Sequence, residues 1–301
     1  MKNPASRILL RPGTLWPAIV RRTQEAIAWG ALQSIQTHQT FLEEGGMRFA
    51  VRIAANLERK ARERRRQARA GGDANPFLPP EPELTVAPIS DTHLAVLNKF
   101  NVVDHHLLIV TRRFEEQEAL LSLADFEALW AAMAEYPALG FYNGGRVAGA
   151  SQRHKHLQTI PLPLYEGGPQ LPIDPLIEAV PSAEGLTRLP VLPFRHRLAR
   201  LAPERLGDPV RAAWQTRRLY LEMLRTLDIP PVQVEGEQRQ SYPYNLLLTR
   251  RWMMVVPRRA EHVGSTSVNA MGFAGSLFVR NEEALEAVRR VGPMTLLREV
   301  A

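Results

Sequence analysis

The 301-residue sequence contains no cysteine, which excludes disulfides, thiolate metal sites and cysteine nucleophiles. No apolar run reaches the roughly 20 residues that a membrane-spanning helix needs. The first residues, Met1 to Arg7, also lack the apolar segment of a signal peptide. We therefore expect a soluble, cytoplasmic protein without a membrane partner. A repeat of fixed period is missing too, so repeat architectures are not expected.

Positive charge is in excess, with 38 Lys and Arg against 31 Asp and Glu and a net charge of +7. Such a surplus attracts polyanions. Part of it lies in a basic run over residues 59–69, which is either a solvated helix end or loop, or a segment that contacts phosphates or RNA. No aromatic residues are interleaved there for base stacking, so we do not expect nucleic acid as the partner.

The distribution of apolar residues predicts both helices and strands. The predicted helices cover residues 14 to about 35, 122 to about 135, 209 to about 227 and a last one from 281, with Ser122 and Asn281 as caps. The predicted strands cover 47–53, 94–100, 106–111, 244–249 and 252–257. We expect 94–100 with 106–111 to form an antiparallel pair and 244–249 with 252–257 to form a hairpin. Helices and hairpins are mixed without regular β–α alternation. The predicted fold class is therefore α+β with largely antiparallel sheets.

Three details of this prediction can be checked against the structure. Ile27 in the first helix and Trp214 in the third are expected to face the core, because both lie on apolar faces of helical period. Residues 141–145 (Phe-Tyr-Asn-Gly-Gly) contain two glycines and an asparagine and are expected to form a turn.

The segment 149–161 carries two of the eight histidines one residue apart, followed by a glutamine. Leu157, Thr159 and Ile160 favour a strand that Pro161 would end. Because alternate side chains of a strand share a face, His154, His156 and Gln158 should project together. Gly149 and the small residues after it allow a ligand to approach the backbone closely.

Three interpretations of this face remain open from the residues alone. Two histidines at positions i and i+2 of a strand are a common way to hold a metal ion. A neutral imidazole can also attack phosphorus, with central His156 as nucleophile, Gln158 donating its amide to a phosphate oxygen, and His154 orienting its neighbour or binding phosphate. Finally, the histidines can be structural or surface residues.

The motifs of the chain resemble those of the ATP adenylyltransferases, also called diadenosine tetraphosphate phosphorylases. This family is part of the histidine-triad superfamily, on the branch of galactose-1-phosphate uridylyltransferase. The resemblance rests on residues 141–145, 149–152 and 154–158, and it extends in the same order to 75–79, 97–100, 244–249 and 252–258. It departs at Arg153, where the family pattern has proline.

The resemblance implies a reaction, a fold and a set of site residues. The family cleaves diadenosine tetraphosphate reversibly with inorganic phosphate to ATP and ADP, through an adenylyl group on the histidine that matches His156. The implied fold is a curved antiparallel sheet of histidine-triad type with packed helices. The implied substrate-binding residues are Lys60 (or Arg59), Asn98, Lys99, Asn143, Gly149, Ala150, Ser151, Gln152, Thr249, Met254 and Arg258, beside His154, His156 and Gln158.

The resemblance also organises the chain and leaves alternatives. Residues 1–165 are expected to form the catalytic region, 166–192 a Pro/Gly-rich linker, and 193–301 a C-terminal region that completes the nucleotide site. No tightly bound cofactor or protein-held metal is expected, although Mg²⁺ can accompany the polyphosphate. The partners are dinucleoside polyphosphates, ATP, ADP and phosphate. A sugar-1-phosphate uridylyltransferase, or a nucleotide- or RNA-binding module without activity, is the alternative.

Overall fold

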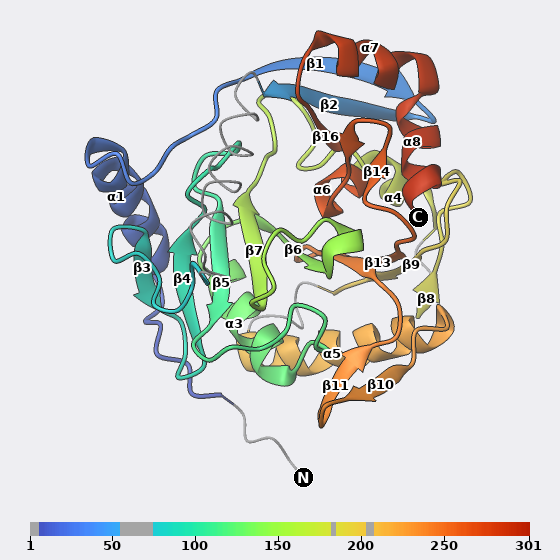
Figure 1. The fold of residues 1–301 in the computed structure, drawn as a ribbon. Coiled ribbons are helices and arrows are strands. Elements are labelled where there is room, and N and C mark those ends of the chain that lie inside the picture. The colour runs from blue at the N-terminus through green and yellow to red at the C-terminus, as the bar shows by residue number, and fades with distance from the viewer. Residues whose placement is uncertain (1–5, 55–74, 182–184, 203–207) are drawn as a thin grey trace.

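The computed structural model describes residues 6–54, 75–181, 185–202 and 208–301 (Figure 1). Lys60, its alternative Arg59 and the basic run 59–69 lie outside the described residues. Nothing about their predicted roles follows from the structure.

A nine-stranded sheet, antiparallel at every seam, forms the centre of the protein. The segment with the two histidines lies near its middle. In spatial order the strands are β3 (Thr85–Pro88), β4 (His93–Leu97), β5 (Leu107–Thr111), β7 (His156–Pro161), β6 (Ala138–Gly144), β12 (Tyr244–Leu248), β13 (Trp252–Pro257), β9 (Arg197–Arg200) and β8 (Leu186–Thr187).

The other strands form one small sheet and two hairpins. The small sheet has the order β1 (Thr37–Glu44), β2 (Met47–Ala54) and β16 (Ser276–Val279), with β16 parallel to β2, and the hairpins are β10 (Pro231–Val234) with β11 (Glu237–Gln240) and β14 (His262–Val263) with β15 (Thr266–Ser267). The small sheet thus joins an early and a late part of the chain.

The helices are short to medium in length. They are α1 (Leu15–Ala28), α3 (Leu123–Met133), α4 (Asp174–Ala179), α5 (Pro209–Thr226), α6 (Ala270–Phe273), α7 (Glu282–Val291), α8 (Pro293–Val300) and a 3₁₀ turn, η1 (Arg146–Ala148). None of those in the described ranges is long and apolar enough to cross a membrane.

Two apolar clusters lie on opposite faces of the large sheet. On the back face, α3 and α5 pack against the sheet, and the cluster includes Phe126, Leu157 and Tyr244. On the front face, α6 and the small sheet cover a second cluster that includes Phe141 and Met254. Figure 1 shows α7 and α8 beside the small sheet. The sheet is therefore buried on both faces over most of its width.

The large sheet contains strands that precede residues 166–192 in the sequence and strands that follow them. These residues themselves contain α4 and β8. Leu171, Ile173 and Leu189 among them are buried in the front cluster. The segment thus packs against the rest of the described chain.

The predicted α+β class and the main local signals are confirmed. Ser122 caps α3, accepting from Asp125 N while its own N–H donates to the Asp125 carboxylate, which is a capping box. Asn281 caps α7 by accepting from Ala284 N. The pairs β4–β5 and β12–β13 are antiparallel, as predicted.

The extent and facing of two helices were predicted wrongly. Helix α1 ends at Ala28 instead of near residue 35, because Gly30 takes a left-handed φ of 72° and Gln33 N pairs with Lys99 O. Ile27 is 54% exposed and Trp214 is 55% exposed. The buried stripe of α5 is made of smaller residues and one tyrosine, Ala212, Ala213, Thr216, Tyr220, Met223 and Leu224. Helix α7 is also followed by α8, which the sequence did not predict.

The prediction of a turn at 141–145 was also wrong. These residues, up to Gly144, belong to β6, which is buried along its whole length. A strand buried on both faces shows no alternation of polar and apolar residues. Gly140 is closely packed, because a Cβ there would lie 2.8 Å from Met133 Sδ and would force that side chain to move. Tertiary contacts override the local turn signal of Asn143 and its neighbouring glycines.

A buried ion pair holds the back of β7. Lys155, which is 1% exposed, places its Nζ 2.8 Å from Asp125 Oδ2 and 3.0 Å from Glu115 Oε2. His93 Nε2 lies 3.0 Å from the other oxygen of the Asp125 carboxylate. The cluster therefore joins α3, β4 and β7 through one carboxylate.

The pKa values in this cluster are set by competition between burial and charge. Burial alone would raise the pKa of Asp125, but Lys155 and His93 outweigh it and hold that pKa well below its usual range. Burial alone would lower the pKa of Lys155, but Asp125 and Glu115 outweigh it and raise that pKa. Both groups are therefore charged at neutral pH.

Removing the cation of this pair should destabilise the fold. Lys155→Met keeps most of the side chain but leaves the buried Asp125 carboxylate without its cation, so the free energy of unfolding should fall by about 3–5 kcal/mol. Arg289→Ala breaks only the exposed pair with Glu286 on α7 and should cost less than about 1 kcal/mol. Urea unfolding of both variants measures the difference. Equal losses would contradict the prediction.

Candidate active site

The front face of β7 carries the predicted side chains together. His154, His156 and Gln158 are 2%, 4% and 8% exposed. The ring of Phe77 lies 5.6 Å from that of His154 and 5.4 Å from that of His156. Lys155 faces the back of the sheet instead. The alternation predicted from the sequence is confirmed.

His156 is held as a neutral imidazole with a lone pair on one nitrogen. Its Nδ1 lies 2.8 Å from the His154 carbonyl oxygen and must donate to it, which leaves the lone pair on Nε2. Burial lowers the pKa of His156 to about 4. The hydrogen bond to the His154 carbonyl raises this pKa but offsets burial only in part, and electrostatic repulsion from the His154 ring lowers it further. A buried, neutral imidazole with its lone pair on Nε2 is suited to nucleophilic attack.

His154 uses both of its ring nitrogens. Nε2 donates to the Thr111 carbonyl at 2.8 Å, and Nδ1 accepts from the Asn75 amide at 2.8 Å. Of the two predicted roles, phosphate binding does not fit this ring. The orienting role fits, because the His154 main-chain carbonyl fixes the tautomer of His156.

Gln158 is oriented by a histidine that the sequence did not single out. His106 Nδ1 lies 3.1 Å from the Asn98 amide nitrogen, so Nδ1 accepts and Nε2 carries the proton. His106 Nε2 then donates to Gln158 Oε1 at 3.0 Å. The amide NH₂ of Gln158 is therefore the end that can donate to a ligand. Asn98, predicted to bind substrate, is hydrogen-bonded to His106 and so supports the orientation of Gln158.

Asn143 stands across from His156 on the neighbouring strand. Its Oδ1 accepts from Asn245 Nδ2 at 2.8 Å and from Ala270 N at 3.0 Å. The side chain is 2% exposed and lies on the same front face as His156. Asn143, predicted to bind substrate from a turn before the motif, thus lies beside His156, and the segment that carries it is a strand.

The loop Gly149 to Gln152 follows η1 and precedes His154. Gly149 has a left-handed φ of 92°, and a Cβ there would lie 2.9 Å from Asn269 Cβ, so no other residue fits. Ser151 is exposed, and Ala150 and Gln152 are half-buried. The loop therefore presents small and amide side chains at the edge of the histidine face.

Arg258 has a different place from the predicted one. Its side chain is fully buried, and its five N–H groups meet five acceptors. Nη1 donates to Asn245 Oδ1 at 2.5 Å and to Ala148 O at 3.2 Å, and the other acceptors are the carbonyls of Ala260, Val268 and Val300. No donor is left for a nucleotide. Arg258 instead holds Asn245 and the residue before Gly149.

Three further predicted residues lie away from the histidine face or are engaged elsewhere. Lys99 Nζ is ion-paired with Glu81 at 2.8 Å. Thr249 accepts a hydrogen bond from Trp252 N in the tight turn between β12 and β13. In the register of the sheet it lies beside Leu139, four residues along β6 from Asn143, which is ~13 Å at ~3.3 Å per residue. Met254 is fully buried in the front cluster.

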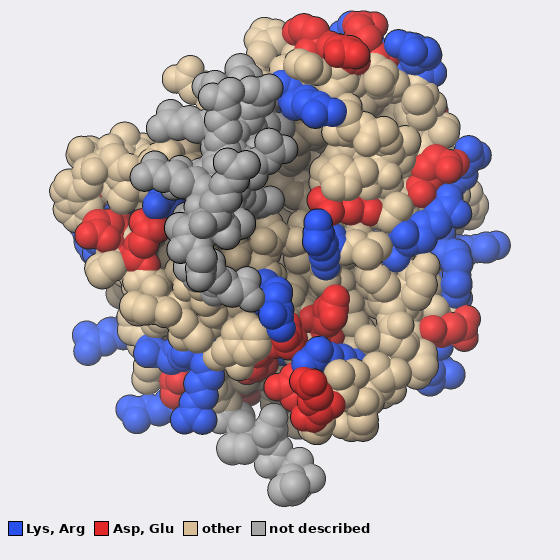
Figure 2. Space-filling model, in the orientation of Figure 1, with Lys and Arg blue, Asp and Glu red and all other residues tan. Residues whose placement is uncertain are grey.

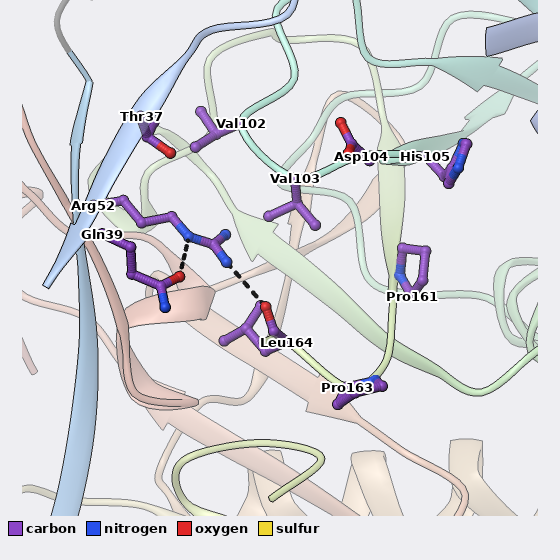
Figure 3. A pocket seen from close by; sticks show the side chains of 10 residues that line it. All are labelled: Thr37, Gln39, Arg52, Val102, Val103, Asp104, His105, Pro161, Pro163 and Leu164. Atoms are coloured by element: carbon purple, nitrogen blue, oxygen red, sulfur yellow. Dashed lines mark hydrogen bonds between the residues drawn. The ribbon is translucent and has the colours of Figure 1, made fainter. Parts of the chain in front are cut away.

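A cavity of about 380 Å³ lies at the other end of β7 (Figure 3). Arg52 reaches into its wall from β2, with Nε donating to Gln39 Oε1 at 3.0 Å and Nη2 to Leu164 O at 2.9 Å. Pro161 also lines it, five residues or ~16 Å along the strand from His156. None of the predicted site residues in the described ranges lines this cavity.

Charge is mixed on this face of the molecule. Figure 2 shows basic and acidic side chains interspersed over the described part of the surface rather than gathered by sign.

Arg153, where the family pattern has proline, lies 2.5 Å from Glu116 and is 69% exposed. Within the described ranges, no three His, Asp or Glu side chains converge closely enough to hold a metal ion.

Sequence analysis missed three residues that support the site. His106, Gln117 and Asn245 contact Gln158, His156 and Asn143 respectively. His106 is a polar residue at the start of a predicted strand, and Asn245 interrupts an otherwise apolar strand. Polar residues inside apolar strands were therefore the available signal. Gln117 had no comparable signal.

Shortening the arginine under the loop should loosen it. Arg258→Lys cannot reach five carbonyl acceptors, so buried oxygens lose their donors and the free energy of unfolding should fall by at least about 2 kcal/mol. Amide hydrogen exchange should speed up at residues 148–152 more than in α5. The control Arg250→Lys removes hydrogen bonds to Met133 O at the far end of the same hairpin. Unchanged exchange at 148–152 would contradict the inferred support.

Two family models match the chain. The model described as the Ap4A phosphorylase N-terminal domain matches residues 5–179, and that described as the ATP adenylyltransferase C-terminal domain matches residues 190–301. Together they span nearly the whole sequence, and the first alone covers more than half of it.

Curated relatives and a solved structure agree with these models. Protein APA1 of Saccharomyces cerevisiae is 25% identical over 305 residues, which cover 92% of this chain and 90% of that protein. Diadenosine 5',5'''-P1,P4-tetraphosphate phosphorylase 2 of the same yeast is 28% identical over 238 residues, 70% of each chain. The crystal structure of yeast Ap4A phosphorylase Apa2 with AMP has the same fold, with a TM-score of 0.76 at 22% identity over 97% of each chain. Because the N-terminal model matches more than half of this chain, the chain belongs to the Ap4A phosphorylase family.

Proposed function

We propose that this chain is a nucleotidyltransferase that cleaves diadenosine tetraphosphate with inorganic phosphate to ATP and ADP, reversibly. The observation that carries the proposal is the state of His156. Its Nδ1 is committed to the His154 carbonyl and its ring is kept neutral, so that Nε2 holds the lone pair. A relative with 28% identity is named as a phosphorylase of this substrate, which supports the same assignment.

In the first step Nε2 of His156 forms a bond to an α-phosphorus. The bond from that phosphorus to the bridging oxygen breaks, and ATP leaves with the electron pair. The imidazole becomes positively charged in the adduct, and its Nδ1–H still points at the His154 carbonyl, 2.8 Å away. This hydrogen bond to a developing cation stabilises the adenylyl intermediate.

In the second step an oxygen of inorganic phosphate attacks the same phosphorus. The nitrogen–phosphorus bond breaks, its electron pair returns to Nε2, and ADP is released. Gln158 can donate its amide NH₂ to a phosphate oxygen in both steps, because His106 occupies the carbonyl end. It cannot transfer a proton to or from water, which favours group transfer over hydrolysis.

The remaining site residues would bind the substrate. Asn143, whose Oδ1 is fixed, and the loop Gly149 to Gln152 lie beside the nucleophile and would hold the polyphosphate. Mg²⁺ would enter as a complex with the substrate, since polyphosphate and water oxygens suit that ion. The roles of Lys60, Lys99, Thr249 and Met254 stay predictions.

The covalent intermediate can be trapped. Diadenosine tetraphosphate with labelled adenosine, supplied without phosphate, should leave an acid-labile, base-stable adduct that phosphate then releases as ADP. His156→Ala should form none, because both ring nitrogens of His154 and of His106 are already hydrogen-bonded. His262→Ala, which alters an exposed histidine, is the control. Labelling of the His156→Ala protein would refute the assignment, and hexose phosphate as acceptor tests the uridylyltransferase alternative.

The pH dependence of adduct formation should show the lowered pKa of His156. Attack needs the neutral imidazole, so the rate falls as the pH drops through the pKa of this group. With that pKa at about 4, the single-turnover rate should stay constant from pH 8 down to about 5. An ordinary histidine would lose half of its rate near pH 6.5. A midpoint there would contradict the burial argument.

Gln158 should govern the choice between transfer and hydrolysis. Gln158→His replaces the amide with a group that can accept a proton from water, so AMP release should rise at least about tenfold relative to ADP. Gln158→Met is the control, because it keeps the approximate length of the side chain and supplies no group that accepts a proton from water. Products are resolved by chromatography. An unchanged product ratio in Gln158→His would count against the amide as the determinant.

A further inference from the structure

The sheet opens at one seam beside the nucleophile. Strands β6 and β7 are paired up to Phe141 opposite Gln158, and the same register, continued by two residues, would place Asn143 opposite His156. That pairing is not made. Both residues keep their outer partners, since His156 pairs with Val110 on β5 and Asn143 with Asn245 on β12. The opening therefore lies between the two strands that carry the site.

A short segment that precedes α3 fills this opening. Glu116 forms an isolated antiparallel bridge with His154, and Lys155 N donates to Glu115 O at 2.8 Å. Gln117 N donates to Arg153 O at 2.6 Å. Residues 153–155, just before His156, therefore pair their main chain with residues 115–117 instead of with β6.

The side chain of Gln117 occupies the fork itself. Its Oε1 accepts from His156 N at 2.9 Å, and its Nε2 donates to the carbonyls of Asn143 at 2.9 Å and His156 at 3.2 Å. The residue is 3% exposed, and its own carbonyl accepts from the Tyr142 hydroxyl. The amide thus acts like one peptide unit placed between the two strands.

This arrangement requires an amide in one orientation. The fork presents one main-chain N–H and two main-chain carbonyls, so the filling group must accept at one end and donate at the other. A carboxylate can only accept, and an apolar side chain can do neither. The three backbone groups belong to His156 and Asn143. A substitution at Gln117 therefore changes the hydrogen bonds of these two site residues directly.

The spacing that Gln117 imposes has a chemical consequence. In a closed antiparallel seam the Cα atoms of opposite residues lie ~4.5–5.5 Å apart, and an inserted amide holds them wider. An α-phosphoryl group bound at Asn143 and the loop must meet Nε2 of His156 in line, and misplacement by ~1 Å can cost ~100-fold in rate.

We propose that Gln117 is a positioning residue of the nucleotidyl transfer, which sets the separation between His156 and Asn143 through their main-chain atoms without touching the substrate. The proposal rests on the proposed function. A group that only filled space at the seam would not need its donor and acceptor ends in this order.

Gln117→Glu tests the donor end through pH. As a carboxylate, the introduced side chain still accepts from His156 N but faces two carbonyls that it repels. When it is protonated, its O–H donates to one of them. The single-turnover rate of adduct formation should therefore be ~10–100-fold below wild type at pH 8 and should recover as the pH falls to about 5.5. The wild-type rate stays flat over this range, and the KM for the dinucleotide should change less than kcat.

Two further variants separate positioning from stability. Gln240→Glu alters another buried glutamine, whose side chain donates to Gly144 O at 2.7 Å and makes no hydrogen bond to β7 within the described residues, so its pH profile should stay flat. Gln117→Met keeps the length without hydrogen bonds and should be slow at every pH. Circular dichroism confirms that each variant is folded. If Gln117→Glu does not fold, Gln117→Asn replaces it, with an amide too short to span the fork and a reduced kcat expected.

The outcomes are distinct. A Gln117→Glu rate that equals wild type, or one whose deficit is the same at every pH, overturns the proposal, and so does a wild-type kcat in Gln117→Asn. A wild-type protein that forms no adduct at all overturns the proposed function instead.

Discussion

Strand β7 and the two residues before it carry polar side chains on both faces near the middle of a wide sheet, and the rest of the structure follows from pairing them. A buried polar group without a partner costs several kcal/mol, so each of these side chains needs one. On the back, Lys155 meets Asp125 and Glu115. On the front, His154 and Gln158 are each hydrogen-bonded to a neighbouring side chain. His156 Nδ1 donates to the His154 carbonyl, so the lone pair of this ring lies on Nε2, the atom that we propose as the nucleophile.

The C-terminal part of the chain completes this arrangement on the same front face, beyond β6. Arg258 holds Asn245, and Asn245 holds Asn143, so that one hydrogen-bonded series runs from β13 through β12 to β6. The same guanidinium binds the carbonyl of Ala148, next to Gly149. Burial lowers the pKa of Arg258 to about 10, yet at neutral pH it remains charged and strengthens each of these bonds. The loop beside His156 therefore depends on a residue that lies far from it in the sequence.

Much of the fold was predictable where short-range patterns decide. The alternation over residues 154–158, the caps at Ser122 and Asn281, and the hairpin of β12 and β13 were all predicted from spacing of a few residues. The predictions failed where burial on both faces removed the pattern. Strand β6 looked like a turn because Asn143 and two glycines carry a turn signal, and only long-range packing turns that signal into a strand.

The sequence by itself determined which side chains share a face along β7 and, through its motifs, the family. It left open whether the two histidines are a nucleophile with its neighbour or metal ligands, and it could not show which nitrogen of His156 holds the lone pair. The position of the lone pair followed from the His154 carbonyl, and the engagement of the His154 ring from Thr111 and Asn75, all of which the fold brings to the rings. Arg258 shows the same limit, since an arginine predicted to bind nucleotide is used up by five carbonyl oxygens. The chemistry of a polar side chain depends on what lies within about 3 Å of it. For these residues the neighbours are set by tertiary contacts that no local pattern encodes.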